Sequence, residues 1–259
     1  VLTMGGFDMD YHEPIFTYRP TMIARKNLIY VICNKIIESV SPNIILLDGM
    51  IEDIDIEVGN VDKIPCPWCN LTKYDSDGIL ENLIGRRAIN EIDRRRRRIM
   101  QEGDVVLHHY NKDNVTDCEG SLRRMLECHS ERWPGAFKAP GLHADLVRYG
   151  VEAGIVDFSE LRVGGKPVSW YIAFVWRDTY YLYMPAWETD YRNRGVGKMH
   201  LAMLVTEAAR RGVKRLDFMR GEEAYKLEWC DSRDYVFDYR IEGRTFRSRL
   251  INALLRLRR

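Results

Sequence analysis

Apolar and polar positions along the chain follow two periods, one typical of helices and one typical of strands. Apolar residues at helical spacing predict helices, at 27–40, 81–101, 119–132, 138–150 and 199–211. Short apolar or aromatic runs bounded by turn residues predict strands, at 43–47, 104–110, 151–163, 167–176, 180–186 and 213–219. Residues 63–78, which include Pro65 and Pro67, are predicted as a loop. Because helices and strands alternate, we expect a mixed α/β fold.

One stretch combines a strand, a basic glycine turn, a helix and a second strand. The strand at 180–186 is rich in aromatic residues, and the helix at 199–211 has a broad apolar face and ends just before Gly212. A short polar helix is expected after the second strand. The turn has the sequence Arg192-Asn193-Arg194-Gly195-Val196-Gly197-Lys198. This order predicts a β-turn-α-β crossover.

The glycine turn has the chemistry of a diphosphate site. A helix start presents unpaired backbone N–H groups and the positive end of the helix dipole. Gly195 and Gly197 let that backbone approach a bulky anion, and Arg192, Arg194 and Lys198 add positive charge around it. The spacing R-x-x-G-x-G differs from that of the dinucleotide fingerprint and from that of the P-loop. The sequence therefore predicts a pyrophosphate site, with a plain basic surface turn as the alternative.

Composition and charge narrow the class of protein. Hydrophobic residues make up 46% of the chain, which is enough for a sizeable core. The 39 Lys and Arg residues against 38 Asp and Glu residues give a net charge of +1, so bulk electrostatic binding to nucleic acid is not favoured. No apolar run approaches the roughly 18 residues that cross a membrane, and no signal-like segment is present. Because the first residue is Val1, a fragment of a longer chain is one interpretation.

The six cysteines are scattered along the chain. Cys66 and Cys69 form a single C-x-x-C, and a structural zinc site would need a second pair at short spacing, for which Cys118 and Cys128 are poor substitutes. A redox role would need a helix directly after the motif. We therefore expect reduced thiols, no metal site and a cytoplasmic location, with zinc or a disulfide as the alternatives.

Two basic segments each have two interpretations. The helix at 81–101 carries Arg86, Arg87 and the run Arg94–Arg98, which cover every side of a helix. They form either a solvated face partly paired with Glu91 and Asp93 or a site for a phosphate-bearing ligand. The tail Arg244–Arg259 has the pattern of a basic amphipathic helix, which either packs on its own domain or lies on an anionic membrane surface.

The glycine turn resembles that of the GNAT superfamily of acyltransferases, whose R/Q-x-x-G-x-G/A turn holds the pyrophosphate of coenzyme A. A three-strand meander at 151–186 precedes the turn, as in the GNAT core. Other motifs resemble the large GNAT branch that includes acetyltransferases of cellulose and exopolysaccharide biosynthesis and is related to Fem-type aminoacyl transferases. These motifs are Asp10-Tyr11…Pro14, the arginine-rich helix Arg86–Arg98, His129-x-x-Arg132-Trp133, Gly165–Val168 and Asp217-Phe218-x-Arg220-Gly221-Glu222-x-x-Tyr225-Lys226-x-x-Trp229. One departure is Arg194-Gly195-Val196-Gly197, where that branch usually has a Ser-Pro-Gly-type turn.

The resemblance implies a fold and a domain organisation. The fold would be a GNAT-like mixed, mostly antiparallel sheet flanked by helices, in two GNAT-like halves in tandem. The N-terminal half would span residues 1–115, and the acyl-CoA-binding half, which has the better turn, would span residues 116–259. No repeat between the halves is visible in the sequence itself.

The resemblance also implies an activity. The chain would be an acyl-CoA-dependent N-acyltransferase, with acetyl-CoA or another acyl-CoA as co-substrate and a primary amine of a small molecule, such as an amino sugar or an amino acid, as acceptor. One alternative is a Fem-like transfer from aminoacyl-tRNA, in which the arginine-rich helix would hold RNA backbone. Another is a catalytically silent GNAT-like module in the assembly of an envelope polymer.

Acyl transfer to an amine needs a bound thioester, a deprotonated amine and a proton for the leaving thiolate. Strand 181–186, with Met184 and Ala186, would pair with the pantetheine arm, and a slot would open near Pro185 between this strand and residues 215–219. Gly195, Val196 and Gly197 would hold the diphosphate together with the cations named above.

Three residues are candidates for the chemistry. Tyr225 resembles the GNAT proton donor to the thiolate, or is a packed tyrosine. Asp217 would accept the amine proton, or is a hydrogen-bonded carboxylate at a strand end. His143 stands where the resembling family tends to have a histidine, and packing is its alternative, as for His129. Weaker candidates for the base or for the substrate contacts are Arg220, Glu222, Lys226 and Glu188.

Overall fold

The computed structural model describes residues 21–51, 53–54, 60–74, 78–134, 141–249 and 253. The chain divides into two compact units, which are described separately. Unit 1 comprises residues 1–65 and 235–259, and unit 2 comprises residues 66–234. The predicted boundary between residues 115 and 116 falls inside unit 2, and the tandem of two GNAT-like halves stays a prediction.

Unit 2 is built on a mixed sheet in which the strand order is β2-β7-β6-β5-β4-β3. All neighbours are antiparallel except β6 and β7, which are parallel, as the predicted crossover requires. The strands are β2 (Asn60–Asn70), β3 (Val105–His109), β4 (Val156–Val163), β5 (Lys166–Trp176), β6 (Thr179–Trp187) and β7 (Arg215–Asp217). The consecutive hairpins β4-β5-β6 confirm the predicted meander.

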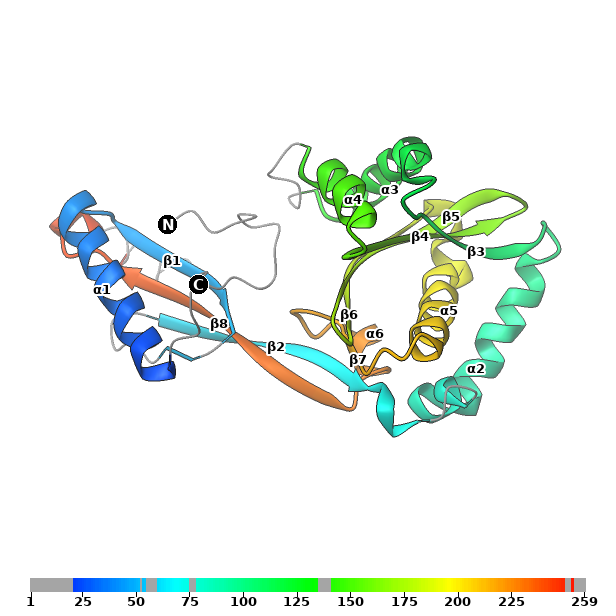
Figure 1. Cartoon of the computed structure of the whole chain (residues 1–259), viewed down its shortest axis with the longest axis horizontal. Coiled ribbons are helices and arrows are strands. Elements are labelled where there is room, and N and C mark those ends of the chain that lie inside the picture. Colours follow the sequence, from blue (N-terminus) through cyan, green and yellow to red (C-terminus); the bar gives the residue numbers. More distant parts are fainter. Residues whose placement is uncertain are drawn as a thin grey trace. The chain divides into compact units, whose positions relative to one another are not determined.

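Helices cover both faces of this sheet (Figure 1). On one face, α2 (Ile79–Ile99) and α5 (Val196–Arg210) pack over a core that includes Tyr171 and Ala173 of β5. On the other, α3 (Glu119–Arg132) and α4 (Leu142–Glu152) pack over a core that includes Trp170 and Ile172. The alternation along β5 follows from the period of two in a strand. The predicted fold class, a mostly antiparallel sheet flanked by helices, is confirmed.

Short helical turns complete unit 2. They are η2 (Leu71–Lys73), η3 (Val115–Cys118), η4 (Thr189–Arg194) and α6 (Ala224–Leu227). The predicted short helix after the second strand of the crossover is α6, and Tyr225 lies in it as expected. In η4 the chain turns from the end of β6 toward the start of α5, which is the region of the predicted site.

Unit 1 contains α1 (Met22–Val40), β1 (Ile44–Met50) and most of β8 (Ser232–Glu242), which pairs antiparallel with β1. Ile29, Cys33 and Ile37, on one face of α1, share a core with residues of β1 and β8. Most of the predicted tail helix Arg244–Arg259, and the motif Asp10-Tyr11…Pro14, lie outside the described residues. Membrane contact through the tail therefore stays a prediction.

Two strands differ from the sequence-based prediction. Residues 63–70 were predicted as part of a loop because of Pro65 and Pro67, yet they belong to β2. Proline is tolerated in a strand where no N–H is needed for pairing. On the side of β2 that faces β7, the paired residues begin only at Trp68. Strand β8 was not predicted, although the buried Val236, Tyr239 and Ile241 lie among more exposed neighbours.

The cysteines are all free thiols, five of them buried and Cys230 partly exposed. Cys66 and Cys69 lie in β2, and burial raises the pKa of the Cys69 thiol. Within the described ranges, no group of three or more His, Cys, Asp or Glu side chains is placed to hold a metal ion. A search of the same ranges finds no helix with the length and apolar character that a membrane crossing requires.

Candidate active site at the start of α5

The glycine turn has the backbone that the sequence predicts. Gly195 is the N-cap of α5 and has φ 77°, a left-handed conformation that glycine adopts without the steric cost of a Cβ. No side chain caps this helix start. A Cβ on Gly197 would come within 3.2 Å of the Trp187 ring, so the first turn of α5 packs closely against the end of β6. The start of α5 therefore has the geometry of an anion site.

The three cations predicted around the turn have different surroundings. Arg194 pairs with Glu102 through both guanidinium nitrogens and stacks on Tyr191, and its hydrogen bond keeps the pKa of Glu102 below its usual value. Lys198 pairs with Glu228. Arg192 is exposed, and the structure describes no ion-pair or hydrogen-bond partner for its side chain. Arg192 is therefore the predicted cation most available to a ligand.

A fourth cation reaches the turn from the arginine-rich helix α2. Arg95 bonds to Glu91, and its Nη1 donates to the backbone oxygen of Asn193 at 3.2 Å. A Cβ on Gly195 would come within 2.7 Å of Arg95 Cδ. Part of the arginine run therefore lies against the predicted anion site, while Arg94 pairs with Glu91 as the solvated-face interpretation expected.

Strands β6 and β7 separate at the level of the predicted slot. Their parallel pairing runs from Thr179–Arg215 to Tyr181–Asp217, whereas β6 remains paired with β5 as far as Trp187. The separation begins before Pro185, close to a register shift that leaves Tyr183 as the extra residue of β6. A splayed strand leaves backbone groups available to a ligand along one edge.

Met184 and Ala186 were predicted to bind the pantetheine arm. Their side chains are buried in the core beneath α3 and α4. Only their backbone is then positioned to pair with a ligand. Val196, predicted to hold the diphosphate, is likewise a core side chain at 1% exposure, which leaves its backbone N–H as the group for that role.

Asp217 ends β7 and is almost completely buried, with 2% exposure. Its Oδ2 accepts from Arg215 Nη2 at 2.7 Å, and its Oδ1 accepts from the backbone N–H of Met219 at 2.8 Å. Met219 has φ 58°, so this second bond holds a strained turn. Such contacts are those of a carboxylate that fixes the backbone, which was the alternative interpretation of this residue.

The loop after β7 holds the other candidates. Lys226, at 5% exposure, donates to the backbone oxygen of Arg220 at 2.6 Å and pairs with Glu223. Glu222 pairs with Arg233 at 2.6 Å. Tyr225 is 37% exposed, and its ring centroid lies 6.4 Å from that of Phe218. Tyr225 is therefore accessible to a ligand, whereas Lys226 is buried.

His143 lies in α4, away from the glycine turn in sequence but against β6. It is 5% exposed, and its Nε2 lies 3.1 Å from the hydroxyl of Tyr183, the extra residue of the register shift. His129, in α3, has its pKa lowered to about 4 by burial and by electrostatic interaction with His143 and Arg132. The two histidines therefore lie near each other on the α3–α4 side of the sheet.

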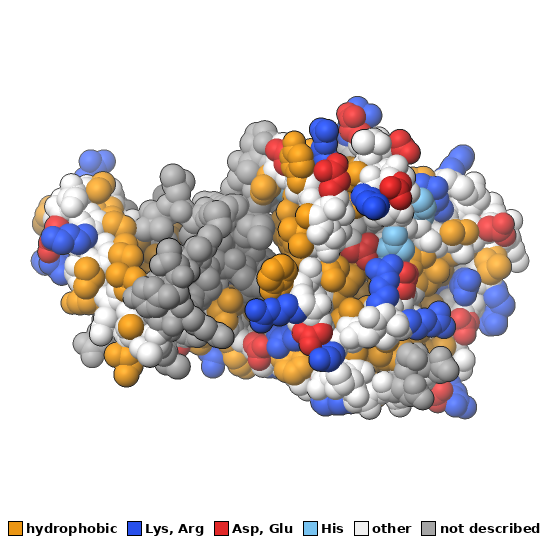
Figure 2. All heavy atoms as spheres, in the orientation of Figure 1, with side chains coloured by type: hydrophobic (Ala, Val, Ile, Leu, Met, Phe, Trp, Pro, Cys, Tyr) orange, Lys and Arg blue, Asp and Glu red, His pale blue; other side chains and the backbone are white. Residues whose placement is uncertain are grey.

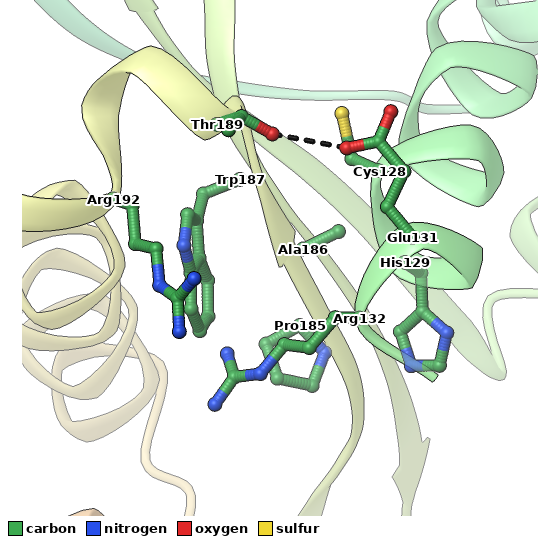
Figure 3. Close-up of a pocket in the computed structure, with 9 residues that line it drawn as sticks. All are labelled: Cys128, His129, Glu131, Arg132, Pro185, Ala186, Trp187, Thr189 and Arg192. Atoms are coloured by element: carbon green, nitrogen blue, oxygen red, sulfur yellow. Dashed lines mark hydrogen bonds between the residues drawn. The ribbon is translucent and has the colours of Figure 1, made fainter. Parts of the chain in front are cut away.

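A pocket of about 320 Å³ lies between the C-terminal end of α3, the end of β6 and η4 (Figure 3). It is lined by Cys128, His129, Glu131, Arg132, Pro185, Ala186, Trp187, Thr189 and Arg192. Arg192, Pro185 and Ala186 were predicted from the sequence as parts of the donor site. Trp187 was not predicted, and Arg132 was named only within a motif. The signal for Arg132 was that motif, His129-x-x-Arg132-Trp133, which had no chemical role attached to it.

A family model identifies the class of protein to which this chain belongs. The family model for the acetyltransferase (GNAT) domain matches residues 86–227, more than half of the chain, and the chain belongs to this family of acyltransferases. The comparison with curated proteins finds no match.

Solved structures show the same fold at low identity. FemX is 9% identical with a TM-score of 0.54, and the match covers 91% of this chain and 82% of FemX. A conserved protein of unknown function from Bacteroides thetaiotaomicron is 14% identical with a TM-score of 0.55, covering 84% of this chain and 75% of that one. A third similar structure is the C-terminal domain (DUF2156) of a lysylphosphatidylglycerol synthetase, so described, from Agrobacterium fabrum. It is 10% identical with a TM-score of 0.52, and the match covers 76% of this chain and 66% of that one.

Proposed function

We propose that this GNAT protein is an acyl-CoA-dependent N-acyltransferase that binds the donor diphosphate at the start of α5. The single observation that carries the proposal is the uncapped helix start behind the left-handed Gly195, next to Arg192 and the pocket. A helix start with free N–H groups favours a bound anion through its dipole and through direct hydrogen bonds. We expect an amino sugar, an amino acid or a related small amine as acceptor.

The separation of β6 and β7 supports the position of the thioester arm. A donor whose diphosphate lies at the start of α5 can extend along the unpaired edge of β6, with backbone bonds to the strand. The acyl group then points toward the register shift at Tyr183, where His143 lies. Arg192 orients the donor, and the packed Trp187 keeps the start of α5 against β6.

For the leaving thiolate we propose Tyr225 as the proton donor. It is partly exposed, and its position near Phe218 lies just beyond the end of β7, where the two strands have separated. Burial is the main cause that raises the pKa of Tyr171. Electrostatic interaction with Tyr225 is the second cause, so Tyr225 lies near this buried tyrosine. We assign Asp217 and Lys226 to holding this loop, because their polar atoms are already engaged.

A transfer from aminoacyl-tRNA is the second candidate function. The similarity in fold to FemX extends over 91% of this chain, which is the reason for considering a Fem-like transferase as the second candidate. On the face seen in Figure 2, however, Lys and Arg side chains are interspersed with Asp and Glu side chains. A tRNA-binding surface concentrates positive charge, and its affinity falls steeply with salt.

Calorimetry separates these candidates. Titration of the chain with coenzyme A and with acetyl-CoA should give saturable heat, whereas titration with tRNA should give heat only at low salt. Absence of heat with both coenzyme A and acetyl-CoA would favour the tRNA-dependent enzyme or a catalytically silent module. We further propose membership of the polysaccharide branch, a cytoplasmic location and membrane contact through the tail.

A further inference from the structure

Two arginines from different elements approach the same indole ring. Arg132 is the last residue of α3, and its guanidinium carbon lies 4.3 Å from the centroid of the Trp187 ring. Arg192 belongs to η4, and Figure 3 shows its side chain beside the same ring. Both arginines line the pocket of about 320 Å³. The pocket therefore contains two positive charges that come from opposite walls.

No carboxylate neutralises these charges within the described part of the chain. The structure records neither an ion pair nor a hydrogen bond for the side chains of Arg132 and Arg192 there. Arg124, on the same helix as Arg132, shows the contrast: it donates to both carboxylate oxygens of Glu188, at 2.8 and 2.6 Å. The pocket carboxylate of Glu131 accepts from the Thr189 hydroxyl at 3.0 Å.

The surroundings favour an anion between the two guanidinium groups. Like charges repel at short range, and the repulsion grows as water is excluded. An anion that binds there removes the repulsion and gains two charge-assisted hydrogen-bonding partners. The cation–π contact with Trp187 holds the Arg132 guanidinium over the ring, so little of its freedom is lost on binding. His129, whose pKa is lowered to about 4, adds no further positive charge to the pocket near pH 7.

We propose that Arg132 and Arg192 together bind a phosphate or diphosphate group of a ligand beside Trp187. A phosphate suits the pair because it carries up to two negative charges and offers several oxygens to planar guanidinium forks. Arg192 also precedes the anion site at the start of α5, and Gly197 of that first turn packs on Trp187. Arg132 is then a phosphate-binding residue that the glycine turn does not supply. The identification of this phosphate as that of the acyl donor rests on the proposed function.

The test compares three single variants by calorimetry with inorganic pyrophosphate and with coenzyme A. Arg132→Gln and Arg192→Gln each remove one charge from the pocket. Arg123→Gln is the matched control, because Arg123 is an exposed arginine of the same helix that does not line the pocket. We expect Arg132→Gln and Arg192→Gln each to weaken pyrophosphate binding about tenfold or more, as loss of a charge-assisted bond does. Arg123→Gln should bind as the natural chain does.

A second readout places the anion beside the ring. Pyrophosphate should change the tryptophan emission of the natural chain, and Trp187→Phe should abolish that change. If Arg132→Gln binds pyrophosphate as tightly as Arg123→Gln does, the inference is overturned. If pyrophosphate binds in a manner that depends on both arginines but coenzyme A does not bind, the inference stands and the proposed donor falls. If coenzyme A binds equally well to Arg132→Gln and to the natural chain, the proposed donor stands and its phosphate is not the one that Arg132 binds.

Discussion

Arg124 of α3 and Glu188, the residue after β6, form a two-point ion pair in which Nε and Nη2 donate to separate carboxylate oxygens. This pair ties α3 to the chain segment that leads into η4 and the glycine turn. The hydrogen bond from Arg124 is the main reason that the pKa of Glu188 lies below its usual value. Glu188, a weaker candidate for the general base in the sequence, is therefore engaged as an anchor of the pocket wall.

The anchor predicts a loss of stability in Glu188→Gln. The free energy of unfolding at pH 7 should fall by about 1 kcal/mol, the upper range for a partly exposed pair. Because the folded pKa of Glu188 is lowered, its contribution is present above the unfolded pKa and disappears as the pH falls through the folded pKa. Urea unfolding at pH 7 and near pH 3 measures this. Glu127→Gln, which removes the more exposed partner of Arg124, is the control and should cost less. An equal loss at both pH values would contradict the ion-pair account.

At the other end of the sheet, His109 bridges two carboxylates. Its Nδ1 lies 2.7 Å from Asp157 and its Nε2 lies 2.8 Å from Glu207. Burial lowers the pKa of His109. The hydrogen bond and charge of Asp157, together with the charge of Glu207, raise this pKa by more than burial lowers it, so the net shift is upward. A raised folded pKa gives stability that is fully present below the unfolded pKa of about 6.5 and is lost as the pH rises through the folded value.

The bridge therefore predicts the pH dependence of His109→Gln. The natural chain should lose stability as the pH rises above about 6.5 and through the raised folded pKa of His109, and the variant should lose less over the same rise. Urea unfolding across that range measures the difference in slope. A variant whose stability curve runs parallel to that of the natural chain would show that His109 does not carry the extra proton. His108→Gln, whose histidine has its pKa lowered mainly by burial, is the neighbouring control.

The Asp217 assignment predicts a structural effect. Asp217→Asn weakens the bonds to Arg215 and to the Met219 N–H, so the free energy of unfolding should fall by about 1–3 kcal/mol. Thermal or urea unfolding measures it beside turnover. If Asp217→Asn folds with unchanged stability yet loses turnover, Asp217 acts as the base and the structural assignment is wrong.

The proton-donor proposal predicts a kinetic effect without a binding effect. Tyr225→Phe keeps the ring that faces Phe218 and removes the hydroxyl, so turnover should fall roughly 100-fold or more while coenzyme A affinity stays within about twofold. Tyr149→Phe, at an exposed tyrosine on α4, is the control for a general loss of activity. Unchanged turnover in Tyr225→Phe rules out the donor role.

The sequence was sufficient for the crossover because its signals are local. The aromatic strand, the glycines at 195 and 212 and the apolar face of α5 all lie within one stretch, and the structure has β6, α5 and β7 in that order. Strand β2 was missed because Pro65 and Pro67 suggest a loop, and its strand partners, β7 among them, lie far along the chain.

The state of the predicted cations depends on distant partners. Arg194 and Lys198 pair with Glu102 and Glu228, which lie 92 and 30 residues away in sequence. The spacing of the turn therefore showed which cations are near the helix start but not which are neutralised. Arg132 and Trp187 meet because α3 packs over the end of β6, so the motif around Arg132 did not predict that these two side chains line one pocket.

The central claim, an anion site at the start of α5 that holds coenzyme A, is tested most directly by one pair of variants. Gly195→Glu places a negative charge at the N-cap of α5, and Gly212→Glu places the same charge after its other end, at nearly the same φ, 79° against 77°. The backbone strain is thus matched. The surroundings differ, because a Cβ at Gly195 would come within 2.7 Å of Arg95 Cδ and one at Gly212 meets nothing within 4 Å. Gly195→Ala adds the same Cβ without the charge and separates this contact from the effect of the charge. Calorimetry with coenzyme A should show binding in the natural chain and in Gly212→Glu and no binding in Gly195→Glu. Equal affinity in Gly195→Glu and Gly212→Glu would contradict the account.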